Sequence, residues 1–465
     1  MAFKKEPLKM LRVFRVPLIL LGIAILIGIG LYISKVFEKR KESAEKKLFD
    51  FNSLNIMEVS IKRRSRNDEV RFRRAGEDLW EMVSPVTAEA DPYVPNGIAR
   101  RLEDEKPSRS FKREEVENLS DFGIEPPDFI ISLKDKEGKE YRLLVGKKAP
   151  IGYSAYVTKE GDENIYLVSA SILNDLNKEI KDYRNRKIMD FSTSDLSQMK
   201  IRRGKEELIF EKETEEKWRI LPMNLRGSND QISKLISTVK DLKVVDFVDD
   251  SPSDLRMYGL LSPEVIIEVQ RKEKEPLILK LGKRFKKDKE ELVYVMKEGK
   301  SSVYSVSSKV YDECMKKLVD FREKKPISFY TWKTKSLNIS TPKGNYIFEK
   351  EKEEKWFLTI GMEKIRAKSF SVEDLLRDIR NVEVEKFVDD APQDLKKYGL
   401  DTPSYIVKIM VEGESPIEVL LSPSKDGVYF KLSNEPYVYL TRSDIIEKLE
   451  IDKEKFKEEE KVETQ

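Results

Sequence analysis

The chain of 465 residues contains no histidine, and it contains one cysteine, Cys314. The lack of histidine removes the usual general base near neutral pH, the Ser-His and Cys-His nucleophile pairs, and the commonest metal ligand. The lack of a second cysteine excludes a disulfide within the chain and a cysteine-rich zinc site. Cys314 lies four residues from Val310 and from Leu318, so we expect a buried, unreactive side chain in a helix.

A dominant charge of one sign is also missing, because 88 basic residues are balanced by 85 acidic ones. No overall field therefore favours binding to nucleic acid. The basic run KRFKKDK at residues 283–289 has acids around it and is predicted to be a solvated loop. At about 150 residues per domain, the length of the chain predicts about three domains.

One long apolar run interrupts this polar composition. Residues 16–33, VPLILLGIAILIGIGLYI, carry no charge, and at about 1.5 Å per residue they match a hydrocarbon thickness of about 30 Å. We expect a transmembrane helix over residues 16–34, preceded by a short basic tail at 1–15 and followed by a helical stalk at 35–47. A cleaved signal peptide is the competing interpretation, although no A-x-A cleavage site follows the run.

The orientation of this anchor is predicted from what lies on either side of it. Lysine and arginine flank the run almost equally on both sides, so the positive-inside count is nearly a tie. A short tail before the anchor and a large body after it favour a cytoplasmic N-terminus with the rest of the chain outside. The expected location is the cell (inner) membrane, as a single-pass protein.

The rest of the sequence repeats itself with a period of about 140 residues. Three series of landmarks keep this period: Phe51, Phe191 and Phe329; Trp80, Trp218 and Trp356; and Gly123, Gly259 and Gly399. The repeats predict three homologous domains at 48–187, 188–325 and 326–455, with a charged disordered tail at 456–465.

Each repeat is predicted to have the α+β class, with a mainly antiparallel sheet and a few short helices. Alternating strands such as DFIISLKD and EYRLLVG indicate half-buried antiparallel pairing. An aromatic precedes each tryptophan by eight residues, and we expect both rings in the core. One helix per repeat follows the tryptophan strand, with Ser228 and Ser371 as predicted N-caps and Asp374 completing a capping box. A second helix, VYDECMKKLVDF in the middle copy, closes the repeat.

A short phrase, RMYGLLSP at 256–263 in the second copy, recurs in all three repeats. Pro252 suits the first turn of a helix, and Gly259 suits the left-handed position just past its end. A Schellman ending predicts a contact between Leu255 and Leu260, and Pro263 prevents the helix from resuming. The phrase is therefore predicted to be a structural stop signal.

Two motifs invite a functional interpretation that their context does not favour. The sequences GKK at 146–148 and GKR at 282–284 lack the upstream glycine and the Ser/Thr of a phosphate-binding loop, and Ser422 replaces the glycine in the third copy. We expect hairpin turns there. The doublets Asp249–Asp250 and Asp389–Asp390 are predicted to cap helices.

The alternative for the acids is an active site. The first copy has Arg113 and Glu114 where the others have the doublet, so any site made by these residues would exist in only two domains. A two-carboxylate glycosidase stays open as an alternative among 85 acids, but nothing selects a pair. Trp332, whose counterpart is Ser194, is a candidate partner contact, with local packing as the alternative.

The arrangement resembles a bacterial family known as domain of unknown function 4340. The residues that carry the resemblance are Trp80, Trp218 and Trp356, with Tyr258-Gly259-Leu260 and Pro263, and Tyr398-Gly399-Leu400 and Pro403. The first copy departs from this pattern with Phe122-Gly123-Ile124. The resemblance implies a membrane-anchored protein without an assigned activity, which often accompanies ABC transporters of the gliding-motility type. It names no catalytic residues.

Repetition without a reactive group of residues predicts a non-enzymatic scaffold or accessory protein. Its expected partners are the membrane, through the anchor, and a protein such as an ABC transporter permease or a cell-envelope protein. No cofactor and no nucleic acid is expected. The alternative is an envelope polysaccharide-binding protein or a carboxylate-dependent hydrolase.

Overall fold

The computed structural model describes residues 28–29, 47–351 and 355–459. The predicted basic tail, transmembrane helix and stalk lie outside the described residues, apart from Gly28, Ile29 and Lys47. Among the residues that are described, no helix combines the length and the apolar character needed to cross a membrane.

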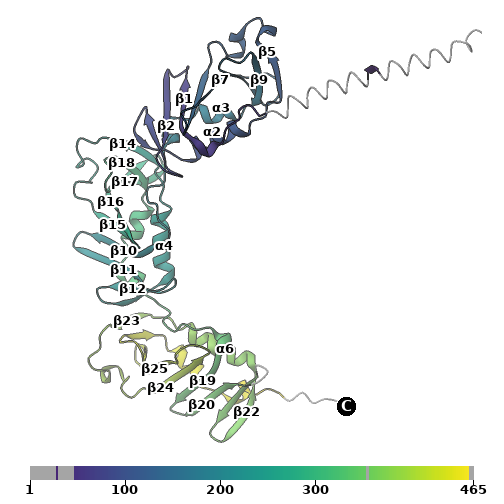
Figure 1. Ribbon diagram of the computed structural model, residues 1–465. Coiled ribbons are helices and arrows are strands. Elements are labelled where there is room, and N and C mark those ends of the chain that lie inside the picture. The colour runs from purple at the N-terminus through teal and green to yellow at the C-terminus, as the bar shows by residue number, and fades with distance from the viewer. Residues whose placement is uncertain (1–27, 30–46, 352–354, 460–465) are drawn as a thin grey trace, which may run out of the picture. The chain divides into compact units, whose positions relative to one another are not determined.

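Three nine-stranded sheets follow one another along the chain (Figure 1). The first contains β1 (Ile56–Arg63), β2 (Asp68–Arg74), β3 (Trp80–Ser84), β4 (Ala88–Glu89), β5 (Arg109–Lys112), β6 (Phe129–Asp135), β7 (Glu140–Lys148), β8 (Ser154–Lys159) and β9 (Asn164–Ser169). The second contains β10 (Leu196–Arg203), β11 (Glu206–Lys212), β12 (Trp218–Leu221), β13 (Leu225–Gly227), β14 (Asp246–Asp249), β15 (Val265–Arg271), β16 (Lys274–Lys287), β17 (Glu290–Lys297) and β18 (Val303–Ser307). The third contains β19 (Thr334–Thr341), β20 (Gly344–Lys350), β21 (Trp356–Ile360), β22 (Glu363–Ala367), β23 (Lys386–Asp389), β24 (Tyr405–Val411), β25 (Ile417–Ser424), β26 (Gly427–Leu432) and β27 (Val438–Thr441).

The strand order is the same in all three sheets, and in the first it is β4-β3-β2-β1-β6-β7-β8-β9-β5. Two antiparallel meanders meet where β1 pairs with β6. The short strand β5, which follows the longest helix of the first domain, α2 (Tyr93–Asp104), then joins the far edge of the sheet beside β9. The prediction of three tandem α+β domains, each with a mainly antiparallel sheet, is confirmed.

Few helices accompany the sheets. Those of the first domain are α2 (Tyr93–Asp104) and α3 (Ile172–Leu176), those of the second are α4 (Asn229–Lys240) and α5 (Lys309–Cys314), and those of the third are α6 (Ser369–Arg380), α7 (Asp444–Leu449) and α8 (Lys453–Phe456). Single 3-10 turns include η1 (Ser53–Asn55), η2 (Arg113–Glu115), η3 (Leu119–Phe122), η4 (Ile180–Tyr183), η5 (Leu318–Phe321), η6 (Thr331–Lys333) and η8 (Lys396–Tyr398).

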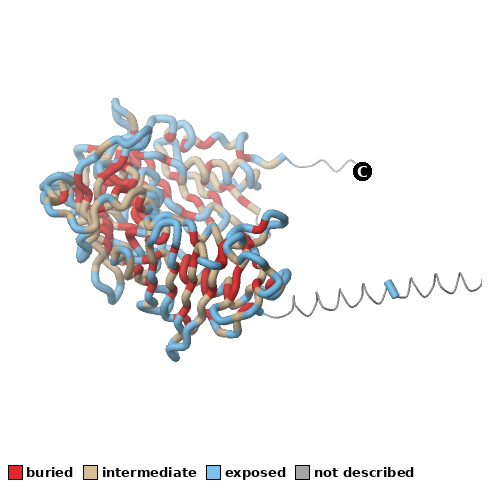
Figure 2. Tube along the Cα trace, turned by 90° about the horizontal axis from the view of Figure 1, so that it is seen from above, coloured by how far each residue is buried: buried red, intermediate tan, exposed pale blue. Residues whose placement is uncertain are grey.

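The chain divides into two compact units, one of residues 1–188 with 243–247 and the other of residues 189–242 with 248–465. Within the first unit, alternation along the strands creates the core. In β1, Val59 and Ile61 are buried while Glu58 and Lys62 are exposed, so one face of the sheet is apolar. The apolar stripe of α2 packs into the same cluster. Figure 2 shows buried residues alternating with exposed ones along the trace.

The predicted pairs of aromatic residues lie in the core of each domain. Phe72 and Trp80 are almost completely buried on neighbouring strands, and the same holds for their counterparts Phe210 with Trp218 and Phe348 with Trp356. A third aromatic, which the sequence analysis missed, packs against each phenylalanine at the end of the domain. The ring pairs are Phe72–Tyr183, Phe210–Phe321 and Phe348–Phe456.

This closing aromatic corrects the predicted tail at 456–465. Phe456 is buried and ends α8, and Lys457 pairs with Ala367 through a β-bridge. The third domain therefore includes residues 456–459, because its core needs the ring of Phe456. Residues 460–465 lie outside the described residues.

Several predicted helix features are also corrected. Ser228 is confirmed as the N-cap residue of α4, although its side chain makes no capping hydrogen bond. Ser371 lies inside α6, whose N-cap is Lys368, and Asp374 pairs with Arg377 rather than forming a capping box. The predicted closing helix is divided into α5 and the 3-10 turn η5, since the chain turns after Cys314 to bring Phe321 into the core.

The glycine of the recurring phrase has the predicted conformation, but it follows a single turn rather than a helix starting at Pro252. That turn has 3-10 geometry in the first and third copies. Gly259 has a φ of 70° and adopts the left-handed conformation. The amide of Leu260 donates to the carbonyl of Leu255 at 3.0 Å, which is the predicted Schellman bond. The same bond joins Ile124 to Leu119 and Leu400 to Leu395.

The GKR motif supports this turn from a neighbouring strand. Gly146 and Gly282 lie within β7 and β16 at bulges, so the predicted hairpin turns are wrong. The amide of Lys283 donates to the carbonyl of Tyr258 at 2.8 Å. A side chain on Gly282 would place its Cβ 2.1 Å from that carbonyl oxygen, so glycine is required by close approach of two backbone segments.

We predict that Gly282→Ala destabilises the second domain by about 1–3 kcal/mol, the usual cost of forcing atoms into a filled space. The matched control is Ser422→Ala at the corresponding position of the third domain, where the strand pairing is regular. Urea unfolding should show the loss, and hydrogen exchange should place it in β16. An equal effect of the two variants would contradict this account of the glycine.

Candidate functional site

The two acid doublets end strands β14 and β23 and hold the recurring phrase in place. The hydroxyl of Tyr258 donates to Asp249 at 3.0 Å, and that of Tyr398 donates to Asp389 at 2.8 Å. The same carboxylates accept the backbone amides of Ser251 and Ala391. The prediction that the doublets cap helices is therefore wrong, because each first acid closes a loop and fixes the phrase to the sheet edge.

These contacts also set the ionisation of the acid in the third domain. The hydrogen bond from Tyr398, followed by the amide of Ala391, lowers the pKa of Asp389 below its ordinary value. Burial and the bond to Asp389 raise the pKa of Tyr398. The carboxylate is thus kept charged as an acceptor, which suits a structural role and not a general acid.

The first domain lacks both partners of this contact at once. Phe122 replaces the tyrosine, and Arg113 replaces the first acid, so no hydroxyl is left without an acceptor. The ring keeps its place, since Phe122 packs edge-on against Tyr156 with 4.6 Å between the ring centroids. The corresponding ring pairs are Tyr258–Tyr294 and Tyr398–Tyr429. The ring contact is common to the three copies, and the hydrogen bond is an addition in two of them.

The second acid of the doublet in the third domain reaches the preceding domain. Asp390 forms a two-point ion pair with Arg322 at 2.5 and 3.0 Å. The guanidinium of Arg322 lies over the ring of Phe387 with 3.7 Å between its central carbon and the ring centroid. Arg226 adds an ion pair to Glu435, and the hydroxyl of Tyr437 donates to the carbonyl of Asn224.

A similar stack occurs at the end of the first domain. Arg184 lies over Phe247 with 3.9 Å to the ring centroid, and the amide of Val244 donates to the carbonyl of Arg186 at 2.8 Å. Sequence reasoning missed these residues. The signal was present, because FVDD occurs at 247–250 and at 387–390, and an aromatic followed by arginine occurs at 183–184 and 321–322.

Trp332, the candidate partner contact, lies in η6 at the start of the third domain and is 68% exposed. Tyr330, which is 51% exposed, lies beside it with 6.0 Å between the ring centroids. The ammonium of Lys333 lies 5.3 Å from the ring centroid of Tyr330 and 5.2 Å from that of Trp332. We call Tyr330, Trp332 and Lys333 the aromatic surface. Both rings are more than half exposed, so local packing uses little of their surface.

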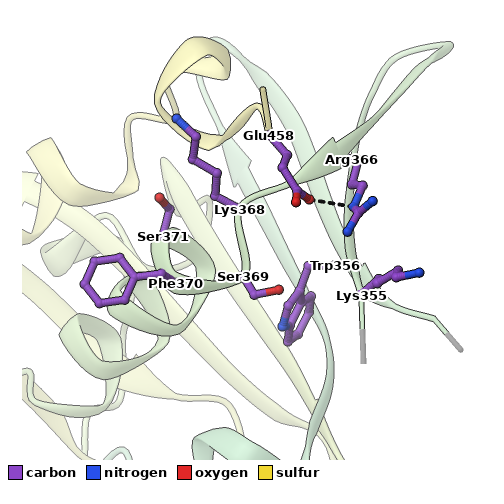
Figure 3. Close-up of a pocket in the computed structure, with 8 residues that line it drawn as sticks. All are labelled: Lys355, Trp356, Arg366, Lys368, Ser369, Phe370, Ser371 and Glu458. Carbon is purple, nitrogen blue, oxygen red and sulfur yellow. Dashed lines mark ion pairs between the residues drawn. The ribbon is translucent and has the colours of Figure 1, made fainter. Parts of the chain in front are cut away.

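A cavity of about 350 Å³ lies where α6 begins beside β21 and β22 (Figure 3). Phe370 and Ser371 come from the first turn of the helix, and the ion pair between Arg366 and Glu458 lies at the opposite side. The buried ring of Trp356 forms part of the wall. The charged pair and the two serine hydroxyls offer binding contacts but no nucleophile paired with a base.

The remaining candidates have structural explanations. Residues 283–289 form the end of β16 and its turn, with exposed lysines, so the expected loop is a strand. Cys314 is buried, as predicted, and burial raises the pKa of its thiol to about 12. Within the described ranges, no three or more Asp, Glu or Cys side chains lie together in a group that could hold a metal ion.

We predict that Tyr398→Phe lowers the free energy of unfolding at pH 7 and makes that free energy less dependent on pH. The pKa of Asp389 is lowered in the folded state, so its contribution is present above the unfolded pKa and is lost as the pH falls through the folded value. Unfolding measured at pH 7 and pH 3 should differ less in the variant. As a control, Phe122→Tyr should bring no gain, because Arg113 offers no acceptor; a gain equal to the loss in the third domain would refute this explanation.

Comparisons with known proteins give a family but no activity. No curated protein matches the chain. Two structures from Pseudomonas aeruginosa share 7% identity with it: the DNA polymerase sliding clamp with ligand, covering 87% of this chain and 95% of that one with a TM-score of 0.15, and the DNA polymerase III subunit beta, covering 88% and 98% with a TM-score of 0.14. Scores this low carry no argument about fold or function.

The family comparison matches three consecutive segments, residues 80–226, 218–368 and 356–462. Each segment begins at the tryptophan that opens the third strand of a sheet, at Trp80, Trp218 and Trp356. The matched segments thus follow the same repeat as the three sheets, offset by two strands. The chain belongs to the family described as Domain of unknown function (DUF4340).

Proposed function

We propose that the protein is a non-enzymatic scaffold or accessory protein, anchored in the cell membrane by residues 16–34, with its three domains outside the cytoplasm. The partner that we propose is a membrane or cell-envelope protein such as an ABC transporter permease. The aromatic surface is the observation that carries this proposal. Large exposed aromatic side chains beside a cation are typical of residues that dominate binding between proteins.

The location of the aromatic surface supports a role in binding more than in folding. Counterparts of Trp332 in the other copies are Ser194 and Leu54, so the fold of a repeat does not require a tryptophan there. The backbone of the turn is held by other contacts, since the amide of Lys333 donates to the carbonyl of Tyr330 and the amide of Glu412 to that of Lys333. A tryptophan that is exposed to solvent, on a turn whose backbone is fixed by hydrogen bonds, is available to bind a partner.

The charged side chains support the same proposal. The acid doublets, which were the best candidates for an active site, are engaged with Tyr258, Tyr398 and Arg322. The alternative of a polysaccharide-binding protein or carboxylate hydrolase would need a separate pair of acids, and a screen for glycan binding and hydrolysis tests it directly. The scaffold proposal expects neither activity.

We predict that Trp332→Ala weakens capture of the partner by about 2 kcal/mol or more, roughly thirtyfold, because it removes an anchor residue. Stability should change by no more than about 0.5 kcal/mol, as usual for an exposed position. The measurement is a pull-down from membranes in mild detergent, followed by titration of the captured protein. Leu54→Ala, at the corresponding exposed position of the first domain, is the matched control. Equal losses of stability and capture, or recovery of no membrane or envelope protein by the unaltered chain, would overturn the proposal.

A further inference from the structure

All three domains end with the same short segment, which we call the exit segment: residues 183–185, 321–323 and 456–458. Each has an aromatic residue followed by a cation. The aromatic carbonyl accepts an amide from the start of the main helix, with donors Asp91, Ser228 and Lys368 at 2.7–2.8 Å. The amide of the third residue donates to a backbone carbonyl of the short strand that precedes the main helix. The acceptors are Glu89 in β4, Arg226 in β13 and Arg366 in β22. The cation in the middle therefore occupies the same place in each domain.

In the first two copies this cation is covered by an FVDD segment. Arg184 and Arg322 are only 6% and 7% exposed, and each lies over the phenylalanine of the segment, Phe247 or Phe387. The contact within the second compact unit also has the ion pair from Arg322 to Asp390, three residues after Phe387. An aromatic and a carboxylate three residues apart are thus the features that an exit segment binds.

In the third copy the cation is Lys457, and it is exposed. Arg366, at the position of Arg226, is paired with Glu458 of its own domain and keeps about half of its side chain exposed. Lys368 adds positive charge at the start of α6, whereas Lys364 on the same short strand is paired with Glu351. The exit segment of the third domain therefore offers the binding elements of the earlier ones without an FVDD segment over it among the described residues.

We propose that the exit segment of the third domain binds a segment of a partner protein that carries an aromatic residue followed three residues later by a carboxylate. Two observations choose this occupant. The binding elements continue the contact that joins the second and third domains, and the positive charge of Lys457 and Lys368 complements an acidic segment. The inference rests on the proposed function for its setting, since it gives the scaffold a second binding surface, separate from Trp332.

A second copy of this chain is a less suitable occupant. Its first domain has Phe111 and Glu114 at the corresponding spacing, but Ser108 stands where the buried Val244 and Val384 precede the phenylalanine in the other copies. Lys112 also pairs with Glu114, which engages the acid within its own domain. The first domain therefore lacks part of the surface that the exit segments contact.

The test uses the purified full-length chain in detergent and a labelled peptide with the sequence of residues 384–392, VEKFVDDAP, whose binding is followed by fluorescence anisotropy. We expect saturable binding that weakens as salt is raised. Peptides with Phe387→Ala or Asp390→Ala should bind at least about tenfold more weakly. Lys457→Glu in the protein should weaken binding by a similar factor, while Lys457→Arg, which restores the residue of the other two copies, should strengthen it.

Lys425→Glu, an exposed charge reversal elsewhere in the third domain, is the matched control and should leave binding unchanged. No saturable binding, or binding that is unaffected by Lys457→Glu, would overturn the proposal. A dimer of the chain that Lys457→Glu dissociates would also overturn it, by assigning the surface to a second copy. The proposed function fails separately, through Trp332→Ala, because the peptide assay does not depend on the aromatic surface.

Discussion

The third domain depends on two adjacent carboxylates, Asp389 and Asp390, that make separate contacts. Asp389 accepts the hydroxyl of Tyr398 and so fixes the recurring phrase to the sheet edge. Asp390, one residue later and just past the end of β23, binds Arg322 of the preceding domain. Two neighbouring residues at the end of β23 therefore serve both the interior of a domain and its connection to the next. A shift of one residue here would break both contacts.

A comparison of the three copies shows which contacts the fold requires and which can vary. The first copy has neither the tyrosine hydroxyl nor its acid acceptor, yet its phrase keeps the left-handed glycine and the bond from Ile124 to Leu119. The third copy has Ser422 in place of the bulge glycine and pairs its strands regularly. Backbone geometry and the aromatic packing are thus the shared requirement, and the polar contacts differ between the domains.

Much of this architecture could be predicted from the sequence. Strict alternation and a period of about 140 residues indicated three antiparallel sheets, and the spacing of Phe72 and Trp80 placed both rings in the core. Gly259 and Leu260 indicated the Schellman bond, because that motif is encoded locally. Helix boundaries were harder to predict, since Ser371 is a good capping residue by type but the exit segment fixes the start of α6 earlier, at Lys368.

Contacts between distant residues were the part that could not be predicted. The helix-capping interpretation of the doublets used only neighbours in sequence, whereas Asp390 finds Arg322 from 68 residues away. The bulge at Gly282 depends on a carbonyl contributed by another loop, and the role of Phe456 depends on Phe348 across the core. Trp332 was singled out because it breaks the repeat, and its exposure agrees with that choice, but no sequence pattern states what covers it.

The burial of Cys314 has a consequence for the chemistry of the folded protein. The thiol is sealed in the second domain, and with a pKa of about 12 it stays protonated and unreactive at any physiological pH. Neither an oxidising nor a reducing compartment has a bond to make or break in this protein. No disulfide can form or be lost within the chain, so the folded state is stabilised by packing, hydrogen bonds and ion pairs.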